Sequence, residues 1–98
     1  ILEYVNANIC EALTPDGVAA RFFISKSRLY TIFKQATGLT VWNYITVKRL
    51  LRARQLLAAG QTPTAVATAC GFRDYTVFFR AYKKKYGVSP RRDYCKRP

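Results

Sequence analysis

An all-α fold of seven helices is predicted for this chain of 98 residues. Apolar residues recur along it at steps of three and four, and no segment alternates in the manner of a half-buried strand. One pattern occurs twice, 49 positions apart, in residues 33–40 and 82–89: an aromatic residue and a lysine, then a glycine, an apolar residue and a hydroxyl residue. We therefore expect two helix-turn-helix subdomains, 1–39 and 61–98, joined by a long central helix, 40–60.

Three helices are expected in the first subdomain. Apolar residues from Ile1 to Leu13 recur at helical spacing, which predicts a helix that packs by one face. Thr14 then supplies a hydroxyl cap for a second helix, with proline and aspartate behind it, and this helix ends near Phe22. Ser25 can cap a third helix, and Gly38 is the left-handed residue that ends it.

The longest helix is predicted from Thr40 to about Ala59. Its apolar band is broad enough to serve two cores, and comprises Val41, Tyr44, Ile45, Val47, Leu50, Leu51, Leu56 and Leu57. Basic residues lie between these positions, and their stems can follow the core margin while their charged heads reach solvent or phosphate. They are Lys48, Arg49, Arg52 and Arg54.

The second subdomain repeats the signals of the first. Thr62 and Pro63 open a helix that ends at Gly71. Asp74 caps the next helix, which Gly87 ends. Ser89 and Pro90 start a last short helix ahead of the basic C-terminal tail.

Charge narrows the class of partner. The net charge is +12, from 17 basic and 5 acidic side chains. Residues 1–47 hold four of the basic and three of the acidic side chains, and residues 48–98 hold the other 13 and two. A polyanion would be bound mainly by the second half, and a basic chain with two helix-turn-helix motifs has the layout of a DNA reader. The alternative is a basic face kept for solubility, although soluble domains usually mix both signs.

Other classes of protein are disfavoured. The chain has no histidine and three widely spaced cysteines, Cys10, Cys70 and Cys95, so we expect no metal and no cofactor. Cys70 is expected to be a buried free thiol, and reduced thiols suit a cytoplasmic protein. No nucleophile with a base and no glycine-rich phosphate loop supports an enzyme. We expect no membrane span and no secretory leader, and the start at Ile1 without any Met indicates a piece of a larger protein.

The candidate DNA contacts lie on the second helix of each motif, because that helix enters the major groove and its first two turns meet base edges. The residues predicted to read bases are Ser27, Tyr30, Thr31, Tyr75, Thr76 and Arg80. The residues predicted to contact phosphates are Lys26, Arg28, Lys34, Arg73, Lys83 and Lys84. Arg80 is the choice for a bidentate guanine contact, and Arg28 is a second candidate for guanine.

Some of these residues have structural alternatives. The rings of Tyr30 and Tyr75 can instead cover the apolar seam between the two helices of their motif. Phe79, beside Arg80, either packs against the preceding helix or meets a thymine methyl group. The run Lys83–Lys85 is either a solvated face or a set of phosphate contacts.

The length of the central helix sets a further expectation. About 18 residues span roughly 27 Å, whereas successive major grooves on one side of DNA are about 34 Å apart. Either the duplex bends toward the protein or only one subdomain inserts fully, and we expect bending.

Twenty residues between positions 49 and 90 match a pattern known from a protein family. They are Arg49, Leu50, Ala53, Leu56, Leu57, Val66, Ala67, Gly71, Phe72, Asp74, Thr76, Phe78, Arg80, Tyr82, Lys83, Lys84, Gly87, Val88, Ser89 and Pro90. In this set the chain resembles the DNA-binding domain of AraC/XylS-family bacterial transcription regulators. The resemblance implies seven helices, binding to double-stranded promoter DNA, activation of transcription more often than repression, and contact with RNA polymerase. It also implies a cytoplasmic, nucleoid-associated protein whose missing N-terminal region senses a signal and dimerises.

Three positions depart from the family pattern. Phe23 stands where a turn glycine is common, which predicts a tighter or displaced turn. Phe79 replaces a small polar residue, and one extra residue precedes Tyr94, which predicts a shifted last helix. A non-specific architectural nucleic-acid binder is the rival interpretation of the same charge.

Overall fold

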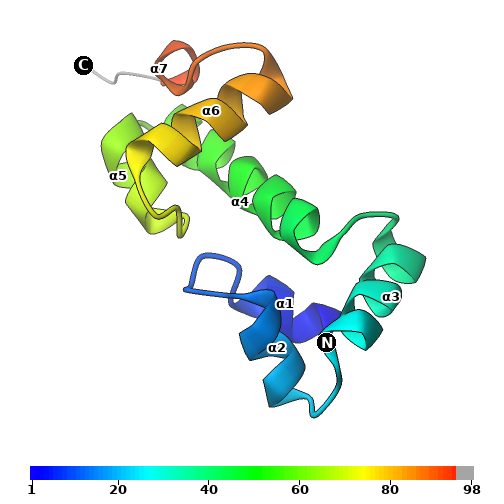
Figure 1. Ribbon diagram of the computed structural model, residues 1–98. Coiled ribbons are helices and arrows are strands. Elements are labelled where there is room, and N and C mark those ends of the chain that lie inside the picture. The colour runs from blue at the N-terminus through cyan, green and yellow to red at the C-terminus, as the bar shows by residue number, and fades with distance from the viewer. Residues whose placement is uncertain (95–98) are drawn as a thin grey trace. The chain divides into compact units, whose positions relative to one another are not determined.

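The structure is a computed structural model, and it describes residues 1–94. Within these residues there are seven α-helices and no strand (Figure 1). The helices are α1 (Leu2–Ala7), α2 (Pro15–Arg21), α3 (Lys26–Thr37), α4 (Val41–Ala58), α5 (Pro63–Ala69), α6 (Tyr75–Tyr86) and α7 (Pro90–Asp93). The predicted all-α fold with a long central helix is confirmed, while Cys95 and the tail Lys96–Pro98 lie outside the described residues. None of the helices in the described part is long and apolar enough to cross a lipid bilayer.

Four of the predicted helix starts are fixed by side-chain caps. The side chains of Thr14, Ser25, Thr62 and Asp74 each accept a hydrogen bond from the backbone N–H three residues later, at 2.9 to 3.3 Å. Each bond satisfies one of the amide donors that the first turn of a helix leaves without a partner. The boundaries of α2, α3, α5 and α6 therefore follow from single residues.

The first helix is shorter than predicted. α1 ends at Ala7, because the side-chain amide of Asn8 donates to the Tyr4 carbonyl at 2.9 Å and the Asn8 backbone N–H turns back to the same carbonyl. An asparagine that bonds the preceding backbone competes with continuation of the helix. The prediction of one helix over Ile1–Leu13 is wrong, although Leu13 is still buried.

The chain divides into an N-terminal unit, Ile1–Lys48, and a C-terminal unit, Arg49–Pro98. In the N-terminal unit α2 packs against α3. Its core consists of Val5, Leu13, Val18, Ala19, Leu29, Phe33, Val41 and Ile45.

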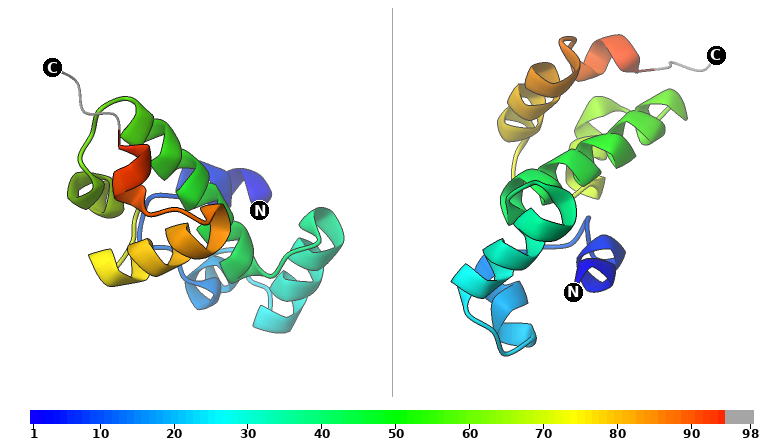
Figure 2. Two further views of the ribbon diagram at one scale, coloured as in Figure 1. Left: turned by 90° about the horizontal axis from the view of Figure 1, so that it is seen from above. Right: turned by 90° about the vertical axis from the view of Figure 1, so that its right-hand side faces the viewer.

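In the C-terminal unit α6 packs against both α5 and α7, and Figure 2 gives two further views in which these three helices can be followed. Its buried apolar residues include Leu50, Ala53, Leu57, Val66, Ala67, Cys70, Phe78 and Tyr82. Cys70 is buried, as predicted.

The residues that α4 buries differ from the predicted band at three positions: Arg49 and Ala53 are buried although neither was placed in it, and Leu51 is exposed. Within the C-terminal unit, Leu50, Ala53 and Leu57 form its buried stripe. Arg49 lies four residues before Ala53, on this stripe, and is only 7% exposed, so the prediction that its head reaches solvent is wrong. Leu51 points away from the stripe and is 45% exposed, so its assignment to the core is also wrong.

The turns inside the two motifs have the same backbone course. The N–H of Phe23 donates to the carbonyl three residues back, and the next N–H donates to the carbonyl five residues back; Gly71 and its successor make the same pair of bonds. This arrangement places the residue after the C-cap in the left-handed region, and φ is +56° for Phe23 and +87° for Gly71. The phenylalanine therefore occupies a glycine position without displacing the turn. Its side chain is 95% exposed.

The last helix is short and begins at the serine-proline pair that was predicted to start it. α7 starts at Pro90, after Ser89, and Tyr94 is its C-cap.

Candidate nucleic-acid interface

The start and the buried side of α3 determine which of its residues face solvent. The Ser25 hydroxyl accepts a hydrogen bond from the Arg28 N–H at 3.0 Å. Leu29 and Phe33 are fully buried in the core of the N-terminal unit. Because residues three and four apart share a helix face, the opposite side must be exposed. The exposed residues are Lys26, Ser27, Arg28, Tyr30, Thr31 and Lys34.

A groove of about 670 Å³ lies beside α3 in the N-terminal unit. It is lined by Tyr30, Thr31, Lys34, Gln35, Thr40 and Trp42. The Thr31 hydroxyl donates to the Ser27 carbonyl at 3.1 Å, so its methyl group and oxygen lone pairs are what it can offer to a partner. Tyr30 is 40% exposed and Trp42 is 47% exposed.

Three of the groove residues, Gln35, Thr40 and Trp42, were not selected from the sequence. Thr40 accepts a hydrogen bond from the Asn43 N–H at 3.2 Å and so caps α4. The available signal was the single tryptophan of the chain, which lies directly inside this capped helix start.

Lys26 already has an acidic partner. Its Nζ lies 3.1 Å from Asp16 Oδ1, which joins the start of α3 to the first turn of α2. The hydrogen bond with Asp16, and then the charge of that carboxylate, raise the pKa of Lys26. Both side chains are largely exposed, so the pair is weak. A phosphate that approaches Lys26 must nevertheless compete with the carboxylate.

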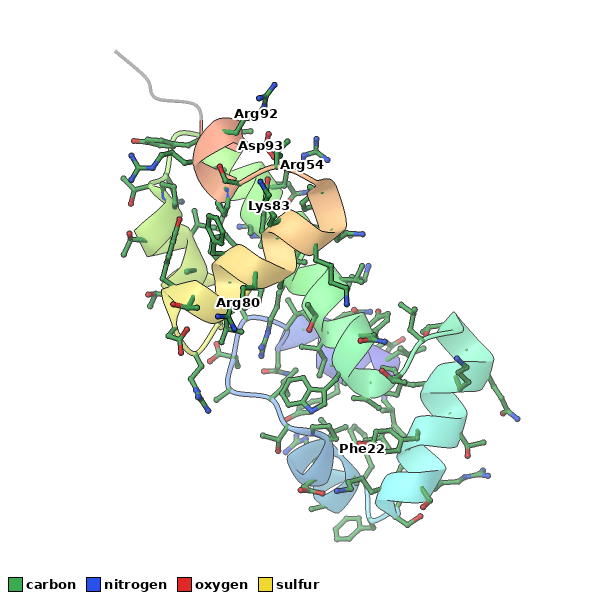
Figure 3. The ribbon with its side chains drawn as sticks, turned by 45° about the horizontal axis from the view of Figure 1, so that its top comes forward. Phe22, Arg54, Arg80, Lys83, Arg92 and Asp93 are labelled. Carbon is green, nitrogen blue, oxygen red and sulfur yellow. The ribbon has the colours of Figure 1, made fainter. Side chains whose placement is uncertain are left out.

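α6 is held in the same way as α3. The Asp74 carboxylate accepts a hydrogen bond from the Val77 N–H at 2.9 Å, and Phe78 and Tyr82 are fully buried. The exposed predicted residues of α6 are Tyr75, Thr76, Arg80, Lys83 and Lys84, with Phe79 beside them. Arg80 and Lys83 are labelled on α6 in Figure 3.

The aromatic residues at the start of α6 are partly used in packing. The Tyr75 ring lies edge-on to Phe78, with 5.9 Å between the ring centroids, and 6.3 Å from Phe79. Tyr75 is 36% exposed and Phe79 is 38% exposed. Tyr75 therefore covers part of the buried ring of Phe78 and still presents its remaining surface to solvent.

All twelve predicted contact residues are exposed. Six lie on α3, five lie on α6, and Arg73 lies in the turn before α6. Together they offer hydroxyl, guanidinium and ammonium donors, the groups that bind phosphate oxygens and base acceptors. A basic, all-helical domain with two helix-turn-helix motifs that present such faces belongs to the class of DNA-binding domains.

Known proteins agree with this class. The family profile described as a helix-turn-helix domain matches residues 18–94. The HTH-type transcriptional activator RhaS of Escherichia fergusonii is 34% identical over 92 residues, which cover 93% of this chain and 33% of that protein. A transcriptional regulator with an AraC-type DNA-binding domain from Chromobacterium violaceum has a similar crystal structure: the TM-score is 0.81 at 32% identity, over 94% of this chain and 83% of that chain. The C-terminal domain of AraT, a response regulator of Geobacillus stearothermophilus, gives a TM-score of 0.88 at 27% identity, over 93% of this chain and 77% of that chain.

The chain belongs to the AraC-type helix-turn-helix family of transcription regulators. The family and the DNA-binding class predicted from the sequence are thereby confirmed. AraC-type domains are DNA-binding domains of transcription regulators and are not enzymes. The chain spans about a third of the length of the curated relatives it matches.

Proposed function

We propose that this domain reads promoter DNA with α3 and α6 each inserted into the major groove. Bases are read by Ser27, Tyr30, Thr31, Tyr75, Thr76 and Arg80, and phosphates are held by Lys26, Arg28, Lys34, Arg73, Lys83 and Lys84. The supporting observation is that two capped helices, each fixed by two fully buried side chains, present eleven of these residues to solvent, and that Arg73 is exposed in the turn before α6. A reading helix must combine a fixed backbone with free polar side chains.

Arg80 carries most of the proposed specificity of α6. It is exposed and has no ion-pair partner within residues 1–94, so its guanidinium is free for two parallel hydrogen bonds to guanine. Lys83 lies one helical turn later, where a point charge serves the backbone better than a base edge. The two side chains therefore make different predictions for sequence preference and for salt dependence.

Selection from a random duplex library at near-physiological salt tests this proposal. The wild-type chain should enrich one motif, and Arg80→Ala should relax preference at one position. Lys83→Ala should keep the motif, weaken all sequences alike and reduce the slope of log affinity against log salt by about 0.9. Arg52→Ala is the matched control, because this arginine of α4 lies outside both faces and its guanidinium already donates a hydrogen bond to Gln55 Oε1 at 3.3 Å, rather than being free for phosphate.

Two results would overturn the proposal. If Arg80→Ala leaves the enriched motif unchanged, the assignment of base reading to α6 is wrong. If the wild-type chain enriches no motif, non-specific architectural binding replaces sequence-specific reading.

The parent protein is proposed to be a cytoplasmic, nucleoid-associated bacterial regulator that activates transcription through contact with RNA polymerase, with sensing and dimerisation in an N-terminal region. The support is that RhaS is named an activator and that the chain spans only a third of its length. Transcription in vitro from a promoter carrying the selected motif decides the sign. More transcript with the parent protein indicates an activator, and less indicates a repressor.

A further inference from the structure

A basic hollow of about 470 Å³ lies in the C-terminal unit, at the end of α6, the turn after it and the start of α7. We call it the α7 cradle. It is lined by Lys83, Gly87, Val88, Ser89, Arg91 and Arg92. Of these residues only Lys83 was selected from the sequence. Figure 3 labels Lys83 on α6 and Arg92 and Asp93 on α7.

The charges that line the α7 cradle are not compensated. The lining holds three cations and no acid. Asp93, the nearest acid along the chain, is already used: it accepts a hydrogen bond from the Tyr82 hydroxyl, and its Oδ2 lies 3.9 Å from Arg54 Nε. In the described part of the chain, neither Arg91 nor Arg92 has an acidic partner. Three such cations around one hollow create a positive potential that attracts an anion.

The backbone of the α7 cradle is anchored. A helix of four residues has no stability of its own, so its place must come from tertiary contacts. Pro90 at its start is fully buried, and Asp93 at its end is bonded to the fully buried Tyr82. The partner of Asp93 in the ion pair, Arg54, lies over the Tyr86 ring at 4.6 Å. Arg91 and Arg92 therefore project from a fixed segment, and the site is formed before any ligand arrives.

Ser89 adds a free hydrogen-bond donor. Although it is the N-cap of α7, its side chain makes no cap hydrogen bond. Its hydroxyl can therefore donate to an oxygen atom in the hollow, beside the ammonium and guanidinium groups. Hydroxyl, lysine and arginine donors together are the usual partners of phosphate oxygens.

We propose that the α7 cradle binds adjacent phosphodiester groups of the DNA strand that borders the groove read by α6, through Lys83, Arg91, Arg92 and Ser89. The inference rests on the proposed function, because Lys83 lies one helical turn from Arg80 and an anion held there lies next to the reading residues. Because the hollow is open to solvent, it suits a phosphate group within a polymer better than it suits a small free ion, which binds best in an enclosed pocket. The cradle thus extends backbone contact beyond α6 to α7.

Salt-dependent DNA binding by single-charge variants tests the cradle. Fluorescence anisotropy with the selected duplex should show that Arg91→Gln and Arg92→Gln each reduce the slope of log affinity against log salt by about 0.9, and the double variant by about 1.8. The enriched motif should stay the same, because phosphate contacts carry no direct sequence information. Arg52→Gln, which removes one exposed arginine of α4, should leave the slope close to that of the wild type.

The outcomes separate the cradle from the proposed function. If the double variant has the same slope as Arg52→Gln, the cradle does not bind DNA. If the double variant binds DNA as the wild type does but loses transcription activation, the cradle serves an acidic protein partner and the proposal is overturned. If the wild type enriches no motif but the slopes measured on a duplex of arbitrary sequence still fall as expected, sequence-specific reading fails and the cradle stands.

Asp93→Asn supplies a test of opposite sign. It raises the net charge by one, so long-range attraction alone predicts tighter DNA binding. Loss of the ion pair with Arg54 should release α7 and weaken binding instead. Tighter binding by a variant with an unchanged melting temperature would show that the anchoring of α7 is irrelevant to the ligand. The exposed arginine variants keep the cradle testable if Asp93→Asn does not fold.

Discussion

Replacing Phe23 by glycine should stabilise the N-terminal unit. Phe23 holds the left-handed position after α2, with φ +56°, and its side chain is 95% exposed. In this conformation the Cβ atom of an L-residue crowds the following carbonyl oxygen. A ring in solvent returns almost no buried area to offset that repulsion. Gly71 occupies the corresponding position of the second motif, where no Cβ is present.

The size of the effect is a difference of two terms. The left-handed conformation costs a residue with a Cβ roughly 1–2 kcal/mol. Glycine also loses more backbone freedom on folding than phenylalanine does, and this entropy lowers the free energy of unfolding by roughly 0.5–1 kcal/mol. We therefore expect Phe23→Gly to raise the free energy of unfolding by about 0.5–1 kcal/mol. Phe23→Ala keeps the Cβ atom and should change it little.

Urea unfolding followed by circular dichroism measures these differences. Phe23→Asn should stabilise the chain as well, since asparagine tolerates the left-handed region without the entropy of glycine. Gly71→Ala is the mirror experiment and should destabilise by about 0.5–1 kcal/mol, since the same two terms apply with opposite sign. If Phe23→Ala stabilises as much as Phe23→Gly, the aromatic side chain rather than the backbone is the source of the effect and the reasoning is refuted.

Three further outcomes are expected. Asp16→Asn removes the carboxylate that pairs with Lys26, so DNA binding should tighten and its salt slope should steepen; weaker binding in the same titration would contradict this. Burial, and then the hydrogen bond to Asp93, raise the pKa of Tyr82, so the folded state favours the neutral phenol. That part of the stability is complete below the ordinary tyrosine pKa of about 10 and is lost as the pH rises above it. Urea midpoints should therefore fall more steeply above about pH 10 for the wild type than for Tyr82→Phe, and parallel curves would refute it. Finally, the 18 residues of α4 span roughly 27 Å, less than the groove repeat of about 34 Å, so circularly permuted DNA probes should reveal a bend; uniform mobility would exclude simultaneous insertion of α3 and α6.

The fold was predictable wherever one residue decides a boundary. Thr14, Ser25, Thr62 and Asp74 act within three residues of themselves, and each of these caps is present. The end of α1 was missed although its cause is also local: here a side-chain hydrogen bond ends a helix instead of starting one. Apolar periodicity continues past Asn8, yet the side-chain bond of that residue to the backbone ends the helix.

The candidate site was predictable from the buried faces of α3 and α6, because two buried residues one turn apart fix which side of a helix is exposed. α4 does not allow this, since its apolar band is too broad to show which residues form the buried stripe. The assignments of Arg49 and Leu51 were wrong for that reason. Arg91 and Arg92 were missed because their surroundings depend on α7 packing against α6. No periodicity in the sequence reveals that contact.

The two units differ in the share of affinity and of specificity that they can supply. α3 carries three basic residues, and one of them, Lys26, is paired with an acid. The C-terminal unit contains the lysines of α6 and the arginines of the α7 cradle, and it has few acidic side chains that could neutralise them. Since phosphate contacts position a protein and base contacts specify the sequence, the C-terminal unit should supply most of the salt-dependent hold on DNA. On the proposed function, the N-terminal unit should contribute mainly discrimination, through the hydroxyl and aromatic groups of α3. Added salt should therefore weaken overall binding strongly while leaving the bases selected by α3 unchanged.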